Sequence, residues 1–247
     1  TGRKPAYNGR EVIIMQIHVV QAGQTLWQIA QAYNVQPGIL ARFNGLREPY
    51  RLSVGQSLLI LRPEALYTVV SGDTVFAIAR KFGLTANELY RMNPGLAAQT
   101  RLYPGQVLVT KLEDEPAEQT YLMGYAYPWV SEPVLRDILP YANALAPFTY
   151  GFTEAGELVE PDDALLLSLA RESDTQALLH LSTLTEQGNF SSARAAAVLQ
   201  NDAARENLIA NTVRTMREKG FSGVDVDFEY LGRELAQSYA AFLEELA

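Results

Sequence analysis

The residues with the clearest chemical potential are three acids in one short stretch near the C-terminus, at 220–230. Asp225, Asp227 and Glu229 alternate there with three apolar residues. Successive side chains of a β-strand point to opposite faces, so the three carboxylates would share one face over roughly 13 Å. Like charges this close repel and favour keeping a proton on one of them. A protonated carboxyl group beside ionised ones suits general acid catalysis, so the stretch predicts a catalytic site.

This stretch resembles the signature of the family 18 glycoside hydrolases, the chitinase-like enzymes, whose Asp-Gly-x-Asp-x-Asp-x-Glu pattern ends the fourth strand of a TIM barrel. The match runs over 222–229, and three of the four acids agree in identity and spacing. Ser222 stands where the family usually has its first Asp, a member of the supporting charge relay. The resemblance implies retaining, substrate-assisted hydrolysis. Glu229 would protonate the glycosidic oxygen, Asp227 would orient the substrate's acetamido group, and Asp225 would modulate both.

Strand and helix patterns alternate around the acids and predict an α/β domain of TIM-barrel type over 120–247. The predicted strands are 121–125, 148–152, 176–181 and the acidic stretch, and the predicted helices are 132–142, 162–171, 192–200, 202–219 and a last one from 233 or 234. Active sites of such barrels lie at the carboxyl ends of strands. We therefore expect Glu229 at the mouth, with substrate-binding candidates Tyr125, Tyr127, Trp129 and Tyr230.

His180 and Ser182 occupy one face of the strand predicted at 176–181, which we expect to point inward. A single histidine in such a position is more often a hydrogen-bonded core residue than a catalyst. We therefore interpret His180 as structural at this stage.

The predicted barrel region is short, because a TIM barrel typically needs about 250 residues. Only about four βα units fit between residues 120 and 247. The sequence therefore predicts an incomplete barrel, the N-terminal half, either as part of a longer enzyme or as a shortened homologue that pairs with another half. Open strand edges would allow self-association.

An internal repeat precedes this region, with copies that begin at residues 18 and 67. Each copy has the pattern strand, helix, helix, strand. Gly23 or Gly72 forms a turn, and Thr25 or Thr74 can cap the first helix. Units this small barely fill a core, which makes them more plausible as binding modules than as enzymes.

The two copies, at 16–61 and 66–110, resemble LysM domains. The second copy has Gly-Asp-Thr at 72–74, Asn-Pro-Gly-Leu at 93–96 and Pro-Gly-Gln at 104–106, and the first copy departs from each element. The resemblance implies binding of N-acetylglucosamine polymers such as peptidoglycan or chitin, and two linked sites gain avidity. The alternative is that these Gly, Thr and Asn residues serve only turns and caps. The glycan-binding candidates are Gly23, Gln24, Thr25, Leu26, Asn44, Gly72, Asp73, Thr74, Val75, Asn93, Pro94 and Gly95.

Composition narrows the remaining function classes. The formal net charge of −8 argues against nucleic acid as the main partner. The chain has no cysteine and two histidines, which excludes a cysteine metal site and disfavours a histidine-rich one. We predict no cofactor, no metal and no membrane span. Residues 1–15 are polar and basic and are interpreted as an N-terminal extension, and the acidic, proline-containing stretch 111–119 as a linker.

Three functions remain open from the sequence. The first is a peptidoglycan-active N-acetylglucosaminidase with two LysM modules, which resembles bacterial spore germination and cortex-lytic enzymes and implies a location in the spore coat, cortex or cell wall. The second is a non-catalytic glycan-binding protein with a truncated, inactive barrel. The third treats the three acids as a divalent-metal cluster of a phosphoesterase, since hard cations prefer carboxylate oxygens.

Overall fold

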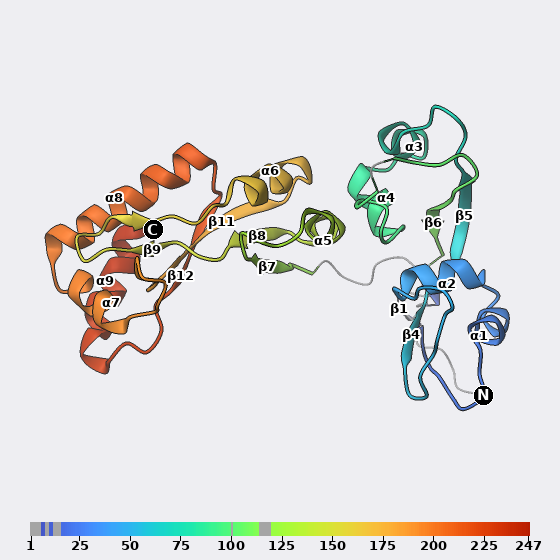
Figure 1. Cartoon of the computed structure of the whole chain (residues 1–247), viewed down its shortest axis with the longest axis horizontal. Helices are drawn as coiled ribbons and strands as arrows, with labels where there is room; N and C mark the ends of the chain where they lie inside the picture. The colour runs from blue at the N-terminus through green and yellow to red at the C-terminus, as the bar shows by residue number, and fades with distance from the viewer. Residues whose placement is uncertain (1–5, 8–9, 12–15, 100, 114–119) are drawn as a thin grey trace. The chain divides into compact units, whose positions relative to one another are not determined.

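The protein is described here by a computed structural model that covers residues 6–7, 10–11, 16–99, 101–113 and 120–247 (Figure 1). It divides into two compact units, Thr1–Thr120 and Tyr121–Ala247. The first unit contains both repeats, and the second contains the alternating strands and helices. Among the described residues, no helix combines the length and apolarity that crossing a lipid bilayer requires.

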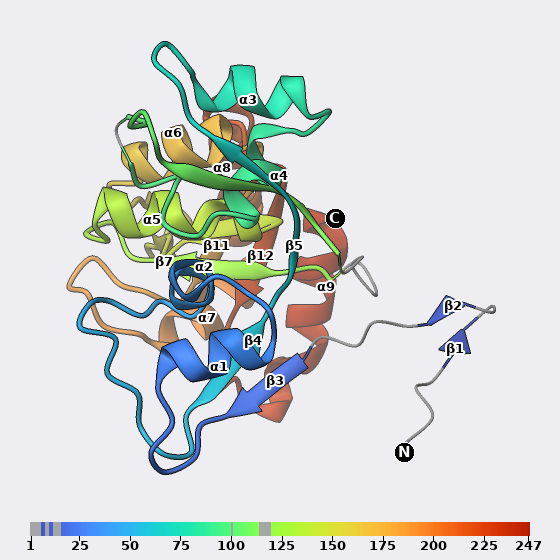
Figure 2. The same ribbon diagram turned by 90° about the vertical axis from the view of Figure 1, so that its right-hand side faces the viewer.

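The first repeat folds as predicted, with two helices packed on a two-stranded antiparallel sheet. Its elements are β3 (Gln16–Val19), α1 (Leu26–Ala32), α2 (Pro37–Phe43) and β4 (Ser57–Ile60), and β3 pairs with β4 (Figure 2). Thr25 caps α1 and forms a reciprocal capping box with Gln28, which satisfies two free N–H groups at the helix start. The core is small and apolar, and its members include Leu26, Ile29, Leu40, Leu58 and Ile60.

The second repeat has the same architecture, with β5 (Pro63–Thr68), α3 (Val75–Lys81), α4 (Ala86–Arg91) and β6 (Val107–Leu112). Strands β5 and β6 pair antiparallel. Thr74 caps α3, as predicted, by accepting a hydrogen bond from the Ala77 N–H. Strand β6 extends to Leu112, so the predicted linker boundary at 111 is wrong: Lys111 pairs with Ala65 in the sheet and forms an ion pair with Glu64.

One asparagine in each repeat fixes the last strand to the second helix. Asn93 is 1% exposed, donates hydrogen bonds to the carbonyls of Leu89 and Val109, and accepts one from the Val109 N–H. Asn44 makes the equivalent three bonds to Leu40 and Leu59. The amide side chain suits this position because it donates and accepts at once.

The N-terminal extension and the linker are described only in part. Strand β1 (Ala6–Tyr7) pairs antiparallel with β2 (Arg10–Glu11). The rest of the predicted extension at 1–15 and residues 114–119 of the predicted linker lie outside the described residues.

The second unit is built on a parallel sheet of four strands, which confirms the α/β prediction. The strands are β7 (Met123–Ala126), β8 (Ala144–Pro147), β11 (Gln176–Ser182) and β12 (Gly223–Asp227), side by side in chain order. Helical segments connect them: α5 (Glu132–Ile138) with a 3-10 turn (Leu139–Tyr141), α6 (Ala164–Glu172), then α7 (Ser192–Leu199) and α8 (Asp202–Lys219). A 3-10 turn (Arg233–Leu235) and α9 (Ala236–Leu246) follow β12.

One predicted strand was wrong in position. The second parallel strand is β8 (Ala144–Pro147), and the predicted segment 148–152 instead leads into a short hairpin of β9 (Gly151–Phe152) and β10 (Leu158–Val159). All four β8 residues are buried. A strand covered on both faces carries no alternating pattern, and the alanines and proline of β8 have low strand propensity, so the pattern of the neighbouring segment 148–152 was stronger.

The helix boundaries in the second unit agree closely with the pattern. Helix α8 occupies the predicted residues, and Gly220 ends it in the left-handed conformation at φ 77°. Figures 1 and 2 both show α5 and α6 lying beside each other, and the two helices are in contact. The larger core cluster gathers residues from β9, β11, α7, α8 and α9, including Phe152, Leu179, Leu208, Phe228 and Phe242.

A polar network lies within this core. The buried Tyr150 hydroxyl donates to Asp163, which is 4% exposed, and the Lys219 ammonium donates to both at 2.8 and 2.9 Å. Lys219 also pairs with Glu160 at 2.9 Å. Because every member has a partner, the network ties the end of α8 to the start of α6 without an unpaired buried charge.

The asparagine clamp generates a stability prediction for the second repeat. Asn93→Ala leaves one N–H and two carbonyls without their partner, and each buried unsatisfied group costs about 1–3 kcal/mol. We expect a loss of about 3 kcal/mol or more, measured as a lower melting temperature and faster hydrogen exchange at β6. The exposed amide Gln99→Ala is the control. Equal stability of both variants would contradict the clamp.

The Tyr150 network generates a pH prediction. Burial, with the hydrogen bond to Asp163 second, raises the pKa of Tyr150 above its usual value. An unfolded tyrosine ionises near pH 10, so the contribution of Tyr150 is full below about pH 10 and is lost as the pH rises toward the folded pKa. Tyr150→Phe should reduce stability at pH 7 by about 1–2 kcal/mol and flatten the alkaline decline, as measured by urea unfolding between pH 7 and 11. Exposed Tyr121→Phe, which also removes one phenol, should keep the decline.

Candidate functional site

Strand β12 presents its acids and its apolar residues on opposite faces, as the alternation predicts. Val224 and Val226 pack against the larger core cluster. Phe228 follows the strand, is 8% exposed, and stacks on Phe242 of α9 with ring centroids 5.5 Å apart. The apolar face therefore anchors the strand under α9, and Asp225 and Asp227 project from the other face.

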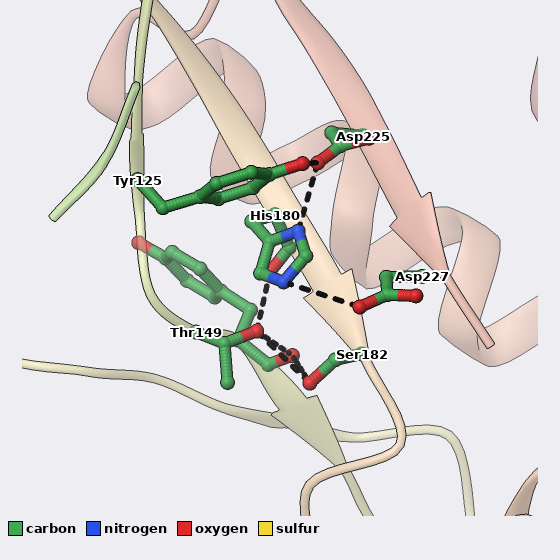
Figure 3. Close-up of polar contacts among 7 residues, drawn as sticks. Tyr125, Thr149, His180, Ser182, Asp225 and Asp227 are labelled. Atoms are coloured by element: carbon green, nitrogen blue, oxygen red, sulfur yellow. Dashed lines mark hydrogen bonds and ion pairs between the residues drawn. The ribbon is translucent and has the colours of Figure 1, made fainter. Parts of the chain in front are cut away.

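Parallel pairing of β11 with β12 adds two polar residues from the neighbouring strand. His180 pairs in register with Asp225, and Ser182 pairs with Asp227. The His180 Nδ1 lies 2.9 Å from the Asp225 Oδ2, and its Nε2 lies 3.8 Å from the Asp227 Oδ2. Figure 3 shows the imidazole between the two carboxylates. The sequence interpretation of His180 as a bonded core residue is correct for Nδ1 and incomplete for Nε2.

Tyr125 from β7 completes the surroundings of Asp225. Its hydroxyl donates to the Asp225 Oδ2 at 2.8 Å (Figure 3). This hydrogen bond, followed by burial and the charges of Asp225 and Asp227, raises the pKa of Tyr125. A phenol that keeps its proton is a lasting donor to the carboxylate. Tyr125 therefore contacts Asp225 directly, and the substrate role predicted for it stays a prediction.

The His180 backbone and its neighbours are fixed by a buried hydroxyl pair. The Thr149 hydroxyl lies 3.0 Å from the His180 carbonyl oxygen and 2.9 Å from the Ser182 hydroxyl. Thr149 and Ser182 are 5% and 0% exposed. These contacts hold the end of β11 in place, so the backbone that carries the imidazole is fixed by packing and hydrogen bonds.

Glu229 lies beyond the end of β12 and opens onto a pocket of about 490 Å³. The carboxylate is exposed, and Asp227 lines the same pocket. Phe148 and Phe190 form apolar parts of the lining, with their ring centroids 6.2 Å apart. An acid in a hollow with aromatic walls has the shape and chemistry to receive a sugar ring.

The four aromatic candidates lie on the exposed side of the site. Tyr127 and Trp129 are stacked on each other at 4.6 Å and 20°, and Trp129 is 77% exposed. Tyr127 also contacts Phe148 at 5.0 Å. Tyr230 is 91% exposed and lines the Glu229 pocket. The structure thus connects Tyr125 and Tyr127 to the site through Phe148 and connects Tyr230 to it directly.

The structure also describes Ser222, the residue that stands in place of the first Asp of the family 18 pattern. Ser222 precedes β12, is exposed, and donates its backbone N–H to the Ala177 carbonyl. Within the described residues, no hydrogen bond joins its side chain to Asp225, Asp227 or Glu229. The same described ranges contain no group of three or more acidic or histidine residues arranged to hold a metal ion.

Many glycan-binding candidates of the repeats have structural partners inside the repeat. Thr25 and Thr74 are helix caps, and Leu26 is 5% exposed. Gln24 accepts from the Gln21 N–H, and Asp73 accepts from the Val70 N–H. Gly23 and Gly72 turn the chain at φ 79° and 90°. The remaining candidates occupy the segment after the second helix or, for Val75, start a helix, and they are Asn44, Val75, Asn93, Pro94 and Gly95.

The Asn93 side chain is buried, so it is not available to a glycan. The Asn93 side chain has almost no exposed surface, and its donors and acceptor are used within the fold. A glycan at this loop would have to contact the backbone or the neighbouring Pro94, which is part of a pocket of about 320 Å³. Their role as glycan ligands stays a prediction.

Sequence reasoning missed two kinds of residue. Trp27 and Phe76 occupy equivalent outward positions of the two repeats and are 69% and 72% exposed. A large aromatic on the polar face of a short helix in both copies was the available signal. In the second unit, Phe148 and Phe190 had no signal, because only the fold brings them to Glu229.

Comparison with known proteins agrees with this architecture. The LysM domain family matches residues 18–61 and 67–111. A cortical fragment-lytic enzyme of Bacillus subtilis is 31% identical over 234 residues, which are 94% of this chain and 54% of that protein. A cortical fragment-lytic enzyme of Bacillus anthracis is 26% identical over 94% of this chain and 55% of its own length.

Solved structures extend the comparison to the fold. The spore cortex-lytic enzyme SleL of Bacillus cereus has a TM-score of 0.69 at 25% identity, and that of Bacillus megaterium has 0.68 at 28%. Each alignment covers 94% of this chain and 55% of the other. The chain spans about half the length of the curated relatives that it matches. It consists of two LysM domains followed by a region similar to the SleL spore cortex-lytic enzymes.

Proposed function

We propose that the chain is a glycoside hydrolase directed to peptidoglycan, which cleaves β-1,4 bonds next to N-acetylglucosamine. One observation carries the proposal: the exposed Glu229 carboxylate opens onto a pocket at the carboxyl end of a parallel strand whose same face bears Asp225 and Asp227. This end of a parallel sheet is where α/β barrels place their active sites.

The first chemical step is protonation of the glycosidic oxygen by Glu229. The bond from that oxygen to the anomeric carbon breaks, while the carbonyl oxygen of the substrate's own 2-acetamido group bonds to the anomeric carbon. The substrate supplies the nucleophile, so no second carboxylate has to attack. In the second step, a water oxygen bonds to the anomeric carbon and gives a proton to the Glu229 carboxylate. The bond from that carbon to the acetamido oxygen breaks, which restores the acetamido group and retains the configuration.

Asp227 and Asp225 support this chemistry from the same strand. Asp227 shares the pocket with Glu229, so its carboxylate is available to accept the acetamido N–H and orient the carbonyl. Asp225 holds hydrogen bonds from Tyr125 and His180 and sets the electrostatic environment of Asp227. Electrostatic groups fixed before substrate arrives are the most effective ones.

The aromatic groups and the LysM domains supply binding. Tyr230 offers an exposed ring in the Glu229 pocket, and the exposed stacked pair of Tyr127 and Trp129 lies next to Phe148 of that pocket, which suits the apolar faces of sugar rings. Each LysM domain adds one exposed ring, Trp27 or Phe76, near its first loop. Two modules on one chain raise the effective concentration of a polymeric glycan for the catalytic unit.

We further propose that the four parallel strands form the first half of a (β/α)8 barrel. Their chain-order arrangement supports this, since a barrel is built by adding successive βα units. Within the described sheet, β7 and β12 each pair on one side only. Such open edges favour pairing with further strands or with a second copy of the chain.

The spore is the proposed site of action. The relatives named above are cortical fragment-lytic and spore cortex-lytic enzymes of Bacillus species, which supports a location in the spore cortex or coat, or more broadly in the cell wall.

A non-catalytic glycan-binding role is the second candidate. The observation that favours it is Ser222 in place of the acid that completes the resemblance. Turnover by the chain distinguishes the two functions, because only the first predicts release of new reducing ends.

Glu229→Gln tests the catalytic assignment. Glutamine keeps the size of the side chain and cannot donate an acidic proton, so we expect turnover of spore-cortex peptidoglycan to fall by about 10²–10⁴-fold. Reducing sugar released per unit time measures this. Binding in a pull-down on the insoluble polymer should stay unchanged, because the LysM domains are intact.

The matched control is Glu154→Gln, the same change at an exposed position of the β9–β10 turn. It should leave turnover unaltered. Equal activity of the Glu229 variant and the parent chain would contradict the role of Glu229. Binding without any sugar release by the parent would favour the non-catalytic function.

A further inference from the structure

His180 is almost completely enclosed at the site. Its side chain is 1% exposed, with Phe148 stacked on the ring at 5.2 Å and 23° and Tyr125 edge-on at 4.9 Å. Two aromatic rings and the β11 backbone thus hold the imidazole plane in one orientation. This orientation aims one ring nitrogen at each of two carboxylates (Figure 3).

The groups that face the ring can be named from every packed element. Tyr125 comes from β7, Phe148 and Thr149 follow β8, Ser182 lies on β11, and Asp225 and Asp227 come from β12. Among these described neighbours, only the two aspartates can carry charge near neutral pH. The His180 ring, if protonated, is therefore one positive charge between the two carboxylates of Asp225 and Asp227.

The hydrogen-bond inventory of the ring is unbalanced in the neutral form. Nδ1 is 2.9 Å from Asp225, whereas Nε2 is buried and has no hydrogen-bond partner within the described residues. A neutral imidazole has one N–H and one lone pair. With the N–H on Nδ1, the Nε2 lone pair faces an Asp227 oxygen. With the N–H on Nε2, the Nδ1 lone pair faces an Asp225 oxygen that already accepts from Tyr125.

One additional proton removes the conflict in either arrangement. A ring with N–H groups on both nitrogens donates to both carboxylates, and a small rotation of Asp227 closes the 3.8 Å gap. Such charge-assisted hydrogen bonds are short and strong. A buried nitrogen left without a hydrogen bond would lower the stability of the folded state.

We propose that His180 is a positioning residue that bridges Asp225 and Asp227 through N–H groups on its two ring nitrogens. The bridge holds one oxygen of Asp227 and leaves the other free toward the pocket, so that a substrate amide meets a carboxylate of fixed orientation. The proposal rests on the proposed hydrolase function for its catalytic consequence, whereas the bridge itself is a property of the folded chain.

The ring nitrogens can be observed by ¹⁵N NMR, and their signals are simple to assign because the chain has only two histidines. His18 lies in the first LysM domain, where it contacts Tyr33 and Gln24, and serves as the internal reference. We expect both His180 nitrogens to carry protons at neutral pH. Asp227→Asn should change the ¹⁵N signal of the His180 Nε2, which faces Asp227, and exposed Asp162→Asn should not. A lone pair on Nε2 that does not respond to Asp227→Asn would overturn the bridge.

Two isosteric variants separate the two contacts. His180→Asn places an amide near the Nδ1 position and keeps only the Asp225 contact, whereas His180→Gln reaches the Nε2 position and keeps only the Asp227 contact. We expect each to lower kcat on cortex peptidoglycan by about 10–100-fold, the worth of one hydrogen bond to a charged group, with KM changed less than kcat.

Thermal unfolding and the His18 signals verify that the variants are folded. A higher KM with an unchanged kcat in the two variants would overturn the positioning role. If the parent chain releases no sugar, the NMR result still decides the bridge: a doubly protonated, Asp227-sensitive ring supports it, while the hydrolase function fails separately.

Discussion

The parallel pairing of β11 with β12 is the constraint on which the site depends. It sets His180 opposite Asp225 and Ser182 opposite Asp227, so four polar side chains share one face. A slip of one residue would turn the acids into the core and the valines toward the pocket. The apolar face prevents such a slip, because Val224, Val226 and Phe228 are packed against the core cluster. The core thus fixes the register, and the register fixes the chemistry.

The surrounding backbone also has to approach closely for this arrangement to hold. A side chain on Gly151 would place its Cβ 2.1 Å from the Leu184 carbonyl oxygen, so only glycine allows β9 to lie beside the end of β11. A Cβ on Gly156 would meet the Ala204 carbonyl at 2.2 Å, where the hairpin turn docks on α8. These two contacts, with the Tyr150 network, fix the hairpin below Thr149, which in turn holds the His180 carbonyl.

Sequence patterns predicted the parts of the structure that are governed by local periodicity. Helix α8, its glycine stop and the two faces of β12 follow directly from spacing. Strand β8 was misplaced because burial on both faces removes the alternation on which the prediction depends. The links from Tyr125 and His180 to Asp225 join residues 100 and 45 positions apart, and no local pattern contains that information. The similarity to longer relatives adds the fold but not these contacts.

Asn93 and His180 are both buried polar residues, and they differ in whether their hydrogen-bond capacity is filled. Asn93 is buried with both amide donors and acceptor used, which marks a side chain kept for the fold. His180 is equally buried but leaves one nitrogen unmatched, aimed at a carboxylate that also lines the pocket. Folding alone does not favour an unmatched polar atom, since a smaller apolar residue would avoid the cost. Among the described residues, the unmatched hydroxyls of Thr110 and Thr212 share this cost, so what distinguishes His180 is the direction of its Nε2, which faces the Asp227 carboxylate at the pocket.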